Sequence, residues 1–234
     1  RPRSSSSSTR LRYLDRSQHT MVSSLIPALV QRLSTPVNHY CGKLFPATAL
    51  IAAEEPGDRL NEEELVATAV LLLGAGHETT MNLIGNGTLA LLRNPDQLTR
   101  LQTEPSLVPS AVEEFLRYDG SVQMTARTPV VDVAIDGKTI PKGQQAIILL
   151  GAANRDPEVF PEPDRLDITR KDNKHIVFSY GIHHCLGAPL ARVEAQVAFS
   201  TLLRRMPKLQ LATDNLEWRE TVTLRGLKSL PVVF

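Results

Sequence analysis

The spacing of apolar positions predicts one long helix in the middle of the chain. Residues 65–93 are apolar on almost every face, a pattern typical of a buried helix. Asn61 with Glu64 three residues later is a capping signature, so the helix is expected to start there. Pro95 cannot continue a helix, and the residue before it also disfavours one, so the helix should end near Arg93.

Shorter elements follow this helix. Helices are predicted over 95–102, 109–118 and 188–206, strands over 126–131, 133–135 and 145–149, a turn at 136–137, a Pro- and Asp-rich loop over 155–170, and a closing hairpin over 221–234 with Gly226 near its turn. There is no internal repeat. Helices dominate and the strand-rich part is small, which predicts an α+β fold that is mainly helical.

Composition narrows the class of protein. The 234 residues can bury a sizeable core as one large or two small domains, and 42% hydrophobic with 22% charged residues argues against disorder or a fibrous repeat. A net charge of +1 gives no reason to expect nucleic acid or an anionic membrane as partner. No apolar run approaches the roughly 20 residues that span a bilayer. Two cysteines cannot form a disulfide framework, which favours a reducing, cytoplasmic location.

Charge is unevenly distributed along the chain. Residues 1–46 carry seven basic and one acidic side chain, net +6, and the remainder carries net −5. The first 20 residues are rich in Ser and Arg, which fits a transit-type targeting segment. It also fits a disordered tail or sequence foreign to the domain, which we favour because compositional assignments are weak evidence. Residues 1–46 are therefore interpreted as a basic leader of unassigned structure.

The densest chemical signal is the segment FSYGIHHCLG, which runs from Phe178 to Gly187. Cys185 stands just before a predicted helix, where free amides and the helix dipole stabilise a thiolate. Gly181 permits a tight turn, and Gly187 lets a flat ligand approach the backbone. A thiolate on such a loop can serve as the axial ligand of haem iron. Taken alone, a single cysteine is more often an inert small hydrophobic residue. A zinc site is not expected either, because His183 and His184 do not have the spacing of zinc-finger ligands.

Two further patterns carry polar residues in apolar surroundings. Glu78 and Thr79 interrupt the long helix, shortly after two glycines that each cost about 1 kcal/mol relative to Ala. Such a departure from helical preference often marks function, although close helix packing through small residues would also explain it. Glu114 and Arg117 form an acid–base pair three residues apart on a helix, which taken alone is a weak surface ion pair.

Together these segments resemble the cytochrome P450 family of haem-thiolate monooxygenases, in the form found in its soluble bacterial branch. The Cys loop meets every fixed position of the family's haem-binding pattern, with Ser179 where Gly is more usual. The sequence AGHETT, starting at Ala75, is similar to the family's oxygen-binding helix, and Glu114-x-x-Arg117 is followed by a Pro-Asp-Arg element ending at Arg165. The resemblance covers residues 47–234 and implies the C-terminal, haem-binding portion of a P450 domain.

The resemblance assigns a role to each motif. It makes Cys185 the proximal iron ligand of haem b and gives Glu78 and Thr79 the delivery of protons during oxygen activation. It places Glu114, Arg117 and Arg165 in a structural triad. Further cofactor-binding residues by resemblance are His183, Arg127, Phe178, Gly181, Gly187, Ala75 and Gly76, and substrate-facing residues are Leu71, Leu72, Val122, Gln123 and Met124.

The implied activity is hydroxylation or epoxidation of an apolar small molecule with O2. Electrons would come from a ferredoxin-type redox partner that docks near Arg192 on the proximal face, and indirectly from NAD(P)H, because the chain carries no reductase motif. Since the resemblance covers only the C-terminal half of the family's pattern, two alternatives stay open. The chain could be a truncated, inactive remnant, or a haem-binding module without turnover.

Overall fold

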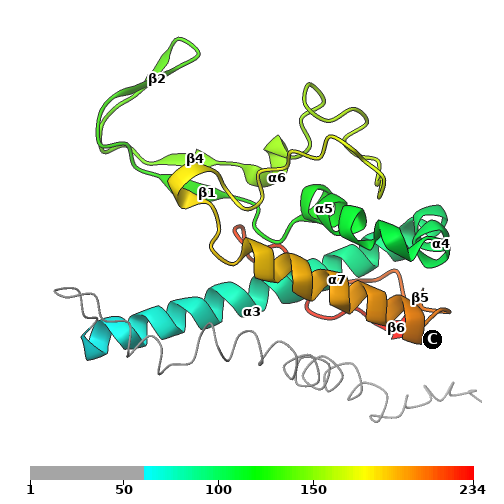
Figure 1. Cartoon of the computed structure of the whole chain (residues 1–234). Coiled ribbons are helices and arrows are strands. Elements are labelled where there is room, and N and C mark those ends of the chain that lie inside the picture. Colours follow the sequence, from blue (N-terminus) through cyan, green and yellow to red (C-terminus); the bar gives the residue numbers. More distant parts are fainter. Residues whose placement is uncertain (1–60) are drawn as a thin grey trace, which may run out of the picture. The chain divides into compact units, whose positions relative to one another are not determined.

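A computed structural model describes residues 61–234, and residues 71–234 form one compact unit (Figure 1). The predicted leader and its boundary near residue 47 lie outside the described residues. The α-helices are α3 (Glu62–Arg93), α4 (Pro95–Thr103), α5 (Val108–Asp119), α6 (Leu150–Ala153) and α7 (Ala188–Arg205), with 3-10 turns η1 (Pro105–Leu107) and η2 (Gly181–His183). The strands are β1 (Thr125–Arg127), β2 (Val133–Ile135), β3 (Lys138–Ile140), β4 (Ala146–Ile148), β5 (Gln210–Leu211) and β6 (Val232–Val233).

Helix α3 begins and ends where its capping residues predict. The Asn61 side chain accepts a hydrogen bond from the Glu64 amide at 3.0 Å, and the Glu64 carboxylate accepts one from the Asn61 amide at 2.9 Å. This reciprocal pair satisfies two amide donors that a helix start leaves without partners. At the other end Asn94 caps the carbonyl of Ala90 through its side chain at 2.8 Å. The predicted bounds of this helix are therefore confirmed.

The core lies where α5 and α7 pack against the second half of α3. The rings of Phe115 and Phe199 meet with centroids 4.7 Å apart, and a Cβ atom at Gly87 of α3 would come within 2.7 Å of Phe199. Only glycine permits this approach of the three helices. The core residues on these three helices are Leu83, Ala90, Leu91, Val108, Ala111, Val112, Phe115, Leu116, Ala195, Phe199 and Leu203, joined by Leu101 from α4 and by Leu166, Ile168 and Val177 from the loops.

Three small antiparallel pairs make up the strand-rich part: β1 with β4, β2 with β3, and β5 with β6. The tight turn predicted at 136–137 joins β2 to β3, and both of its residues have positive φ. Within the unit, β1 and β4 lie beside the Cys loop in Figure 1. The pair brings Arg127 to the position from which it contacts that loop.

The closing hairpin predicted over 221–234 is wrong. Strand β6 pairs instead with β5, which follows α7, and the reversal of the chain lies earlier, closed by a bridge between Trp218 and Leu227. Gly226 is no turn residue. A Cβ atom there would meet the Asn82 side chain of α3 at 2.2 Å, so glycine is required for a close approach of two segments.

Substitution of Gly226 by Ala is expected to destabilise the fold by about 1–3 kcal/mol, because the added methyl group must displace Asn82. Gly85 provides a matched control in the same helix, since a Cβ atom there meets nothing within 4 Å. Gly85→Ala should stabilise the protein by up to about 1 kcal/mol through helix propensity. Denaturant unfolding of both variants checks the pair of results, and equal effects would contradict the packing assigned to Gly226.

No helix among residues 61–234 combines the length and the apolar character that crossing a membrane requires.

Candidate cofactor-binding site

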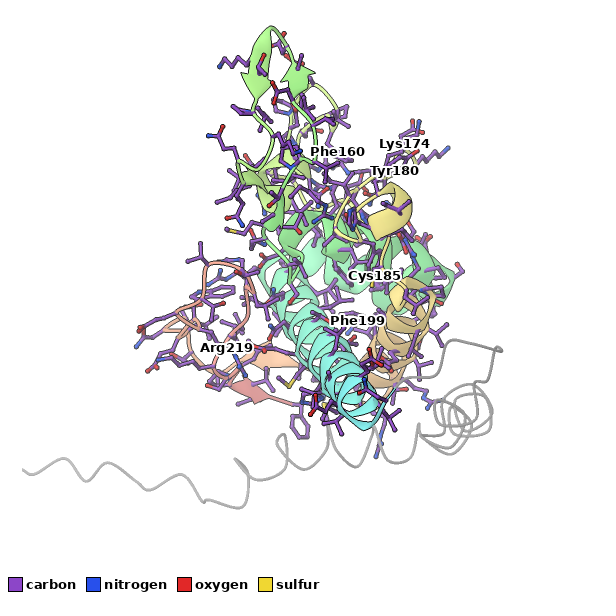
Figure 2. The ribbon with its side chains drawn as sticks, turned by 90° about the vertical axis from the view of Figure 1, so that its left-hand side faces the viewer. Phe160, Lys174, Tyr180, Cys185, Phe199 and Arg219 are labelled. Carbon is purple, nitrogen blue, oxygen red and sulfur yellow. The ribbon has the colours of Figure 1, made fainter. Side chains whose placement is uncertain are left out.

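Cys185 stands on an ordered loop immediately before α7, with its thiol free and exposed (Figure 2). Its amide donates to the Phe178 carbonyl at 2.8 Å, and its own carbonyl accepts from the amide of Ala188, the first residue of α7, at 3.2 Å. Between these bonds the chain turns through Ser179 and Gly181, whose φ angles are 62° and 63°. The backbone therefore holds the cysteine at the helix start that the sequence predicts.

Arg127 reaches the Cys loop from strand β1. Its guanidinium donates to the hydroxyl of Ser179 at 3.1 Å and to the hydroxyl of Thr125 at 2.9 Å. Within residues 61–234 no carboxylate pairs with it. Arg127 is thus a cation beside the loop whose charge is open to an anionic group of a ligand, such as the propionate that the resemblance implies.

An ion-pair network centred on Glu113 of α5 supports the Cys loop. The sequence analysis did not predict this network. The Glu113 carboxylate accepts two hydrogen bonds from Arg192 of α7, at 2.7 and 3.0 Å, and contacts Nε2 of the buried His175 at 3.1 Å. The Arg192 guanidinium lies 4.6 Å from the ring centroid of Phe178, a cation–π contact with the first residue of the Cys motif. Three elements are thereby joined around the loop: α5, the segment before the loop, and α7.

These contacts set the protonation of Glu113. Burial disfavours its charged form, but hydrogen bonds from His175 and Arg192 outweigh burial and lower the pKa of the Glu113 carboxyl from 4.5 to about 2. Because the folded-state pKa lies below the unfolded value, the ionised Glu113 carboxylate contributes its full stabilisation above about pH 4.5. This stabilisation is lost as the pH falls towards 2.

We expect Glu113→Gln to remove that pH-dependent contribution, about 1–2 kcal/mol because the carboxylate is partly exposed. The measurement is the free energy of unfolding between pH 6 and pH 2.5, where the wild type should lose more stability than the variant. Glu104→Gln, at an exposed surface pair, serves as control and should follow the wild type. Parallel curves for wild type and Glu113→Gln would show that the network is absent in solution.

Glu114 and Arg117 form a fully buried ion pair. Two guanidinium nitrogens of Arg117 donate to the two carboxylate oxygens of Glu114, each at 2.8 Å, and the side chains of both residues are 0% exposed. Arg117 also donates to the carbonyls of Asn154 and Pro163, at 3.0 and 2.9 Å. The surface-pair interpretation therefore does not apply, and the pair ties α5 to the long loop before Cys185.

The third member of this cluster is Arg170, and the prediction of Arg165 is wrong. Arg170 lies 3.2 Å from the Glu114 carboxylate, whereas the Arg165 guanidinium pairs with Glu162 at 3.1 Å and is mostly exposed. Arg165 contributes only its backbone carbonyl, which accepts from Arg117 at 3.3 Å. The loop 155–170 turns through Glu162, whose φ is 49°, and this turn pairs Arg165 locally with Glu162.

The predicted oxygen-binding residues lie on an unbroken stretch of α3. The Thr79 hydroxyl donates to the Ala75 carbonyl of its own helix at 2.6 Å, so the hydroxyl bonds along the helix and opens no groove in it. Glu78 makes an ion pair with Arg219 at 3.2 Å. A Cβ atom at Gly74 or Gly76 would meet nothing within 4 Å, so the space beside this part of the helix is open.

Contacts between α3 and α7 place this stretch beside the Cys loop. Phe199 of α7 contacts Gly87 of α3, and the Glu194 carboxyl, whose pKa is raised by burial, contacts the Thr80 hydroxyl. Both helices run in the same direction through these contacts, as Figure 1 shows. The start of α7, with Cys185 just before it, therefore lies towards the part of α3 that carries Gly76 and Thr79.

The predicted substrate residues fall into two groups. Leu71 and Leu72 are exposed on α3, next to the open glycines. Val122, Gln123 and Met124 are half-buried after α5, where Val122 bridges Leu224. The Gln123 side chain donates to the Gly120 carbonyl at 2.6 Å, a contact that serves the local fold and gives no support to a substrate role.

The described residues fit a flat, apolar metal macrocycle. Within residues 61–234 no cluster of three or more His, Cys, Asp or Glu could hold a bare metal ion, so Cys185 offers a single ligand. Gly187 leaves open space beside that thiol, because a Cβ atom there would meet only the Cys185 sulfur, at 3.9 Å, and a Cβ atom at Gly181 on the same loop would meet nothing within 4 Å. The same loop carries exposed apolar side chains, Ile182 at 97% and Leu186 at 82% exposure. His183 is exposed on the same turn.

An exposed cysteine on a helix-start loop, open glycines on a neighbouring helix and a buried Glu–Arg pair are the arrangement expected of a haem-thiolate class of protein. Comparison with known proteins identifies the family. The cytochrome P450 family model matches residues 42–211. The chain belongs to the cytochrome P450 family, whose members hold a haem iron.

The similar proteins are bacterial. The chain is 53% identical to cytochrome P450 CYP107DY1 of Priestia megaterium over 80% of this chain and 46% of that protein. It is 53% identical to a vitamin D(3) 25-hydroxylase of Pseudonocardia autotrophica over 80% of this chain and 47% of that protein. The chain thus spans about half the length of the curated relatives it matches.

Solved structures agree with this fold. P450BioI, crystallised with an acyl carrier protein that bears hexadec-9Z-enoic acid, superimposes with a TM-score of 0.74 at 53% identity, covering 76% of this chain and 46% of that one. The tirandamycin C-bound monooxygenase TamI gives a TM-score of 0.76 at 44% identity, covering 88% and 53%. The described residues therefore form part of the P450 fold, mainly helical with small sheets.

Proposed function

We propose that this chain supplies the haem-binding part of a P450 monooxygenase, which hydroxylates or epoxidises an apolar small molecule. The observation that carries the proposal is the exposed Cys185 thiol on a loop held by Arg127 and by the Glu113–Arg192 pair. The overall reaction inserts one oxygen atom of O2 into the substrate. The other atom leaves as water and takes up two electrons and two protons.

The residues have separate tasks in this proposal. Cys185 binds the iron through its thiolate, and haem, when bound, supplies the oxygen chemistry. Arg127 and His183 bind the haem carboxylates, with a charge-assisted bond from Arg127. Glu78 and Thr79 hold and move protons on the side of α3, and Ala75 and Gly76 lie against the flat ligand. Leu71, Leu72, Val122 and Met124 contact an apolar substrate.

Electrons come from a redox partner of ferredoxin type in this proposal, and indirectly from NAD(P)H. The resemblance places Arg192 on the proximal face, where that partner docks. Its ion pair with Glu113 and its contact with Phe178 favour a different task, in which it stiffens the loop that a partner would approach. The cytoplasmic location stays a prediction from the cysteine content.

The test of activity follows oxygen into the product. The chain is loaded with haem, supplied with an electron source and an apolar substrate panel, and run under ¹⁸O2. The proposal predicts one ¹⁸O atom per product molecule. Haem uptake with no product from the panel, even with peroxide as oxidant, would favour a haem-binding module without turnover.

A further inference from the structure

A polar stripe on α3 receives the segment 218–227, which is remote in sequence. Glu78, Asn82 and Asn86 are spaced four residues apart and therefore lie on one face of the helix. Each contacts the segment. Glu78 pairs with Arg219 at 3.2 Å, Asn82 packs against Gly226, and the Asn86 amide donates to the Arg225 carbonyl at 3.1 Å. The acid assigned to proton delivery is thus the first residue of a docking stripe.

Arg219 is held in place by contacts other than its ion pair with Glu78. Its amide donates to the Gly226 carbonyl at 2.9 Å, its Nε donates to the Leu227 carbonyl at 3.4 Å, and the neighbouring Trp218 bridges Leu227. These bonds join the two arms of the 218–227 reversal. Because Asn82 and Asn86 fix that reversal on α3, the guanidinium has little freedom to move along the helix.

Two neighbouring cations of this region have carboxylate partners of their own. Lys228 pairs with Glu217 at 3.3 Å, and Arg225 pairs with Asp119 at 2.6 Å. Within residues 61–234 Glu78 has no other cationic partner, and Arg219 has no other carboxylate. The side chains are 33% and 36% exposed, so both still reach solvent. This arrangement leaves a carboxylate that is fixed in direction but accessible to water.

We propose that Arg219 is the positioning residue of Glu78, the residue before Thr79 in α3, and holds its carboxylate in one orientation. A glutamate on a partly open helix face otherwise samples several rotamers, which lowers the time it spends in any single geometry. The catalytic consequence rests on the function proposed above, in which Glu78 takes part in proton delivery. The positioning itself is a property of the chain without haem.

The first arm of the experiment uses the whole chain without haem. Glu78 is identified by its ¹³C carboxyl resonance, which disappears in Glu78→Gln, and the Arg219 guanidinium by ¹⁵N labelling. Arg219→Gln should move the Glu78 resonance away from its wild-type position. Arg219→Lys should leave the resonance close to that position. In Glu78→Gln the guanidinium protons of Arg219 should exchange with water about three- to fivefold faster, the change expected for loss of a partly exposed ion pair.

Lys228→Gln is the matched control, since it removes an exposed ion pair between the two residues that flank the 218–227 segment. It should leave the Glu78 resonance and the Arg219 exchange unchanged. An Arg219→Gln variant that folds with the wild-type unfolding midpoint and leaves the Glu78 resonance unshifted would overturn the proposal. If Arg219→Gln fails to fold, the exchange measurement in Glu78→Gln decides alone.

The second arm uses the haem-loaded chain and separates the two proposals. Arg219→Gln should lower the product formed per O2 consumed while leaving the KM for substrate unchanged, and Arg219→Lys should recover part of the loss. An unchanged yield, with the resonance shift present, would overturn the catalytic consequence. Failure of the wild type to take up haem would contradict the proposed function, whereas the first arm would still decide whether Arg219 positions Glu78.

Discussion

Substitution of Glu114 by Gln is expected to lower the free energy of unfolding by about 3–5 kcal/mol, a large fraction of the roughly 5–15 kcal/mol that is typical of a folded domain. The substitution leaves the Arg117 guanidinium, whose side chain is 0% exposed, without its carboxylate partner. Glu114 also accepts from the Asp167 amide and from Arg170, so three anchors of the loop before Cys185 weaken together. Urea unfolding at neutral pH measures the effect.

Two arginine variants provide the controls. Arg165→Gln should change stability by no more than about 0.5 kcal/mol, because its guanidinium is exposed and, among residues 61–234, pairs only with Glu162. Arg170→Gln should cost more than Arg165→Gln, because Arg170 is buried against Glu114. The reverse order would restore Arg165 as the third member of the cluster and contradict the geometry described above.

Substitution of Cys185 by Ala is expected to remove the thiolate ligand and, with it, the thiolate signature in the spectrum of the haem-loaded chain. No other cysteine among residues 61–234 could replace it. The measurement is the visible spectrum after reduction and addition of carbon monoxide. Cys41→Ala, which replaces the other cysteine of the sequence, is the matched control and should keep the signature. A signature that survives in Cys185→Ala would show that the ligand is misassigned.

Local sequence signals sufficed for features that depend on neighbouring residues. The capping pair Asn61 and Glu64 and the break at Pro95 set the ends of α3, and the loop motif placed Cys185 just before α7. These predictions rest on hydrogen bonds and backbone restrictions within a few residues, which a sequence displays directly.

Features that depend on distant contacts could not be predicted in the same way. Arg165 and Arg170 are five residues apart in one loop, and only the folded turn decides which of them faces Glu114. Gly226 was interpreted as a turn residue, because its actual reason, the approach of Asn82, lies 144 positions away in sequence. The Glu113–His175 and Glu78–Arg219 contacts also span long separations and carried no local signal.

The account rests centrally on a haem-thiolate site formed by Cys185 and the loop around it. Its most direct test is titration of the purified chain with haem, followed by reduction and addition of carbon monoxide. The account predicts saturable haem uptake and the strongly red-shifted Soret band of a thiolate-ligated carbon monoxide complex. Absence of haem uptake, or uptake with an unshifted band, would contradict it.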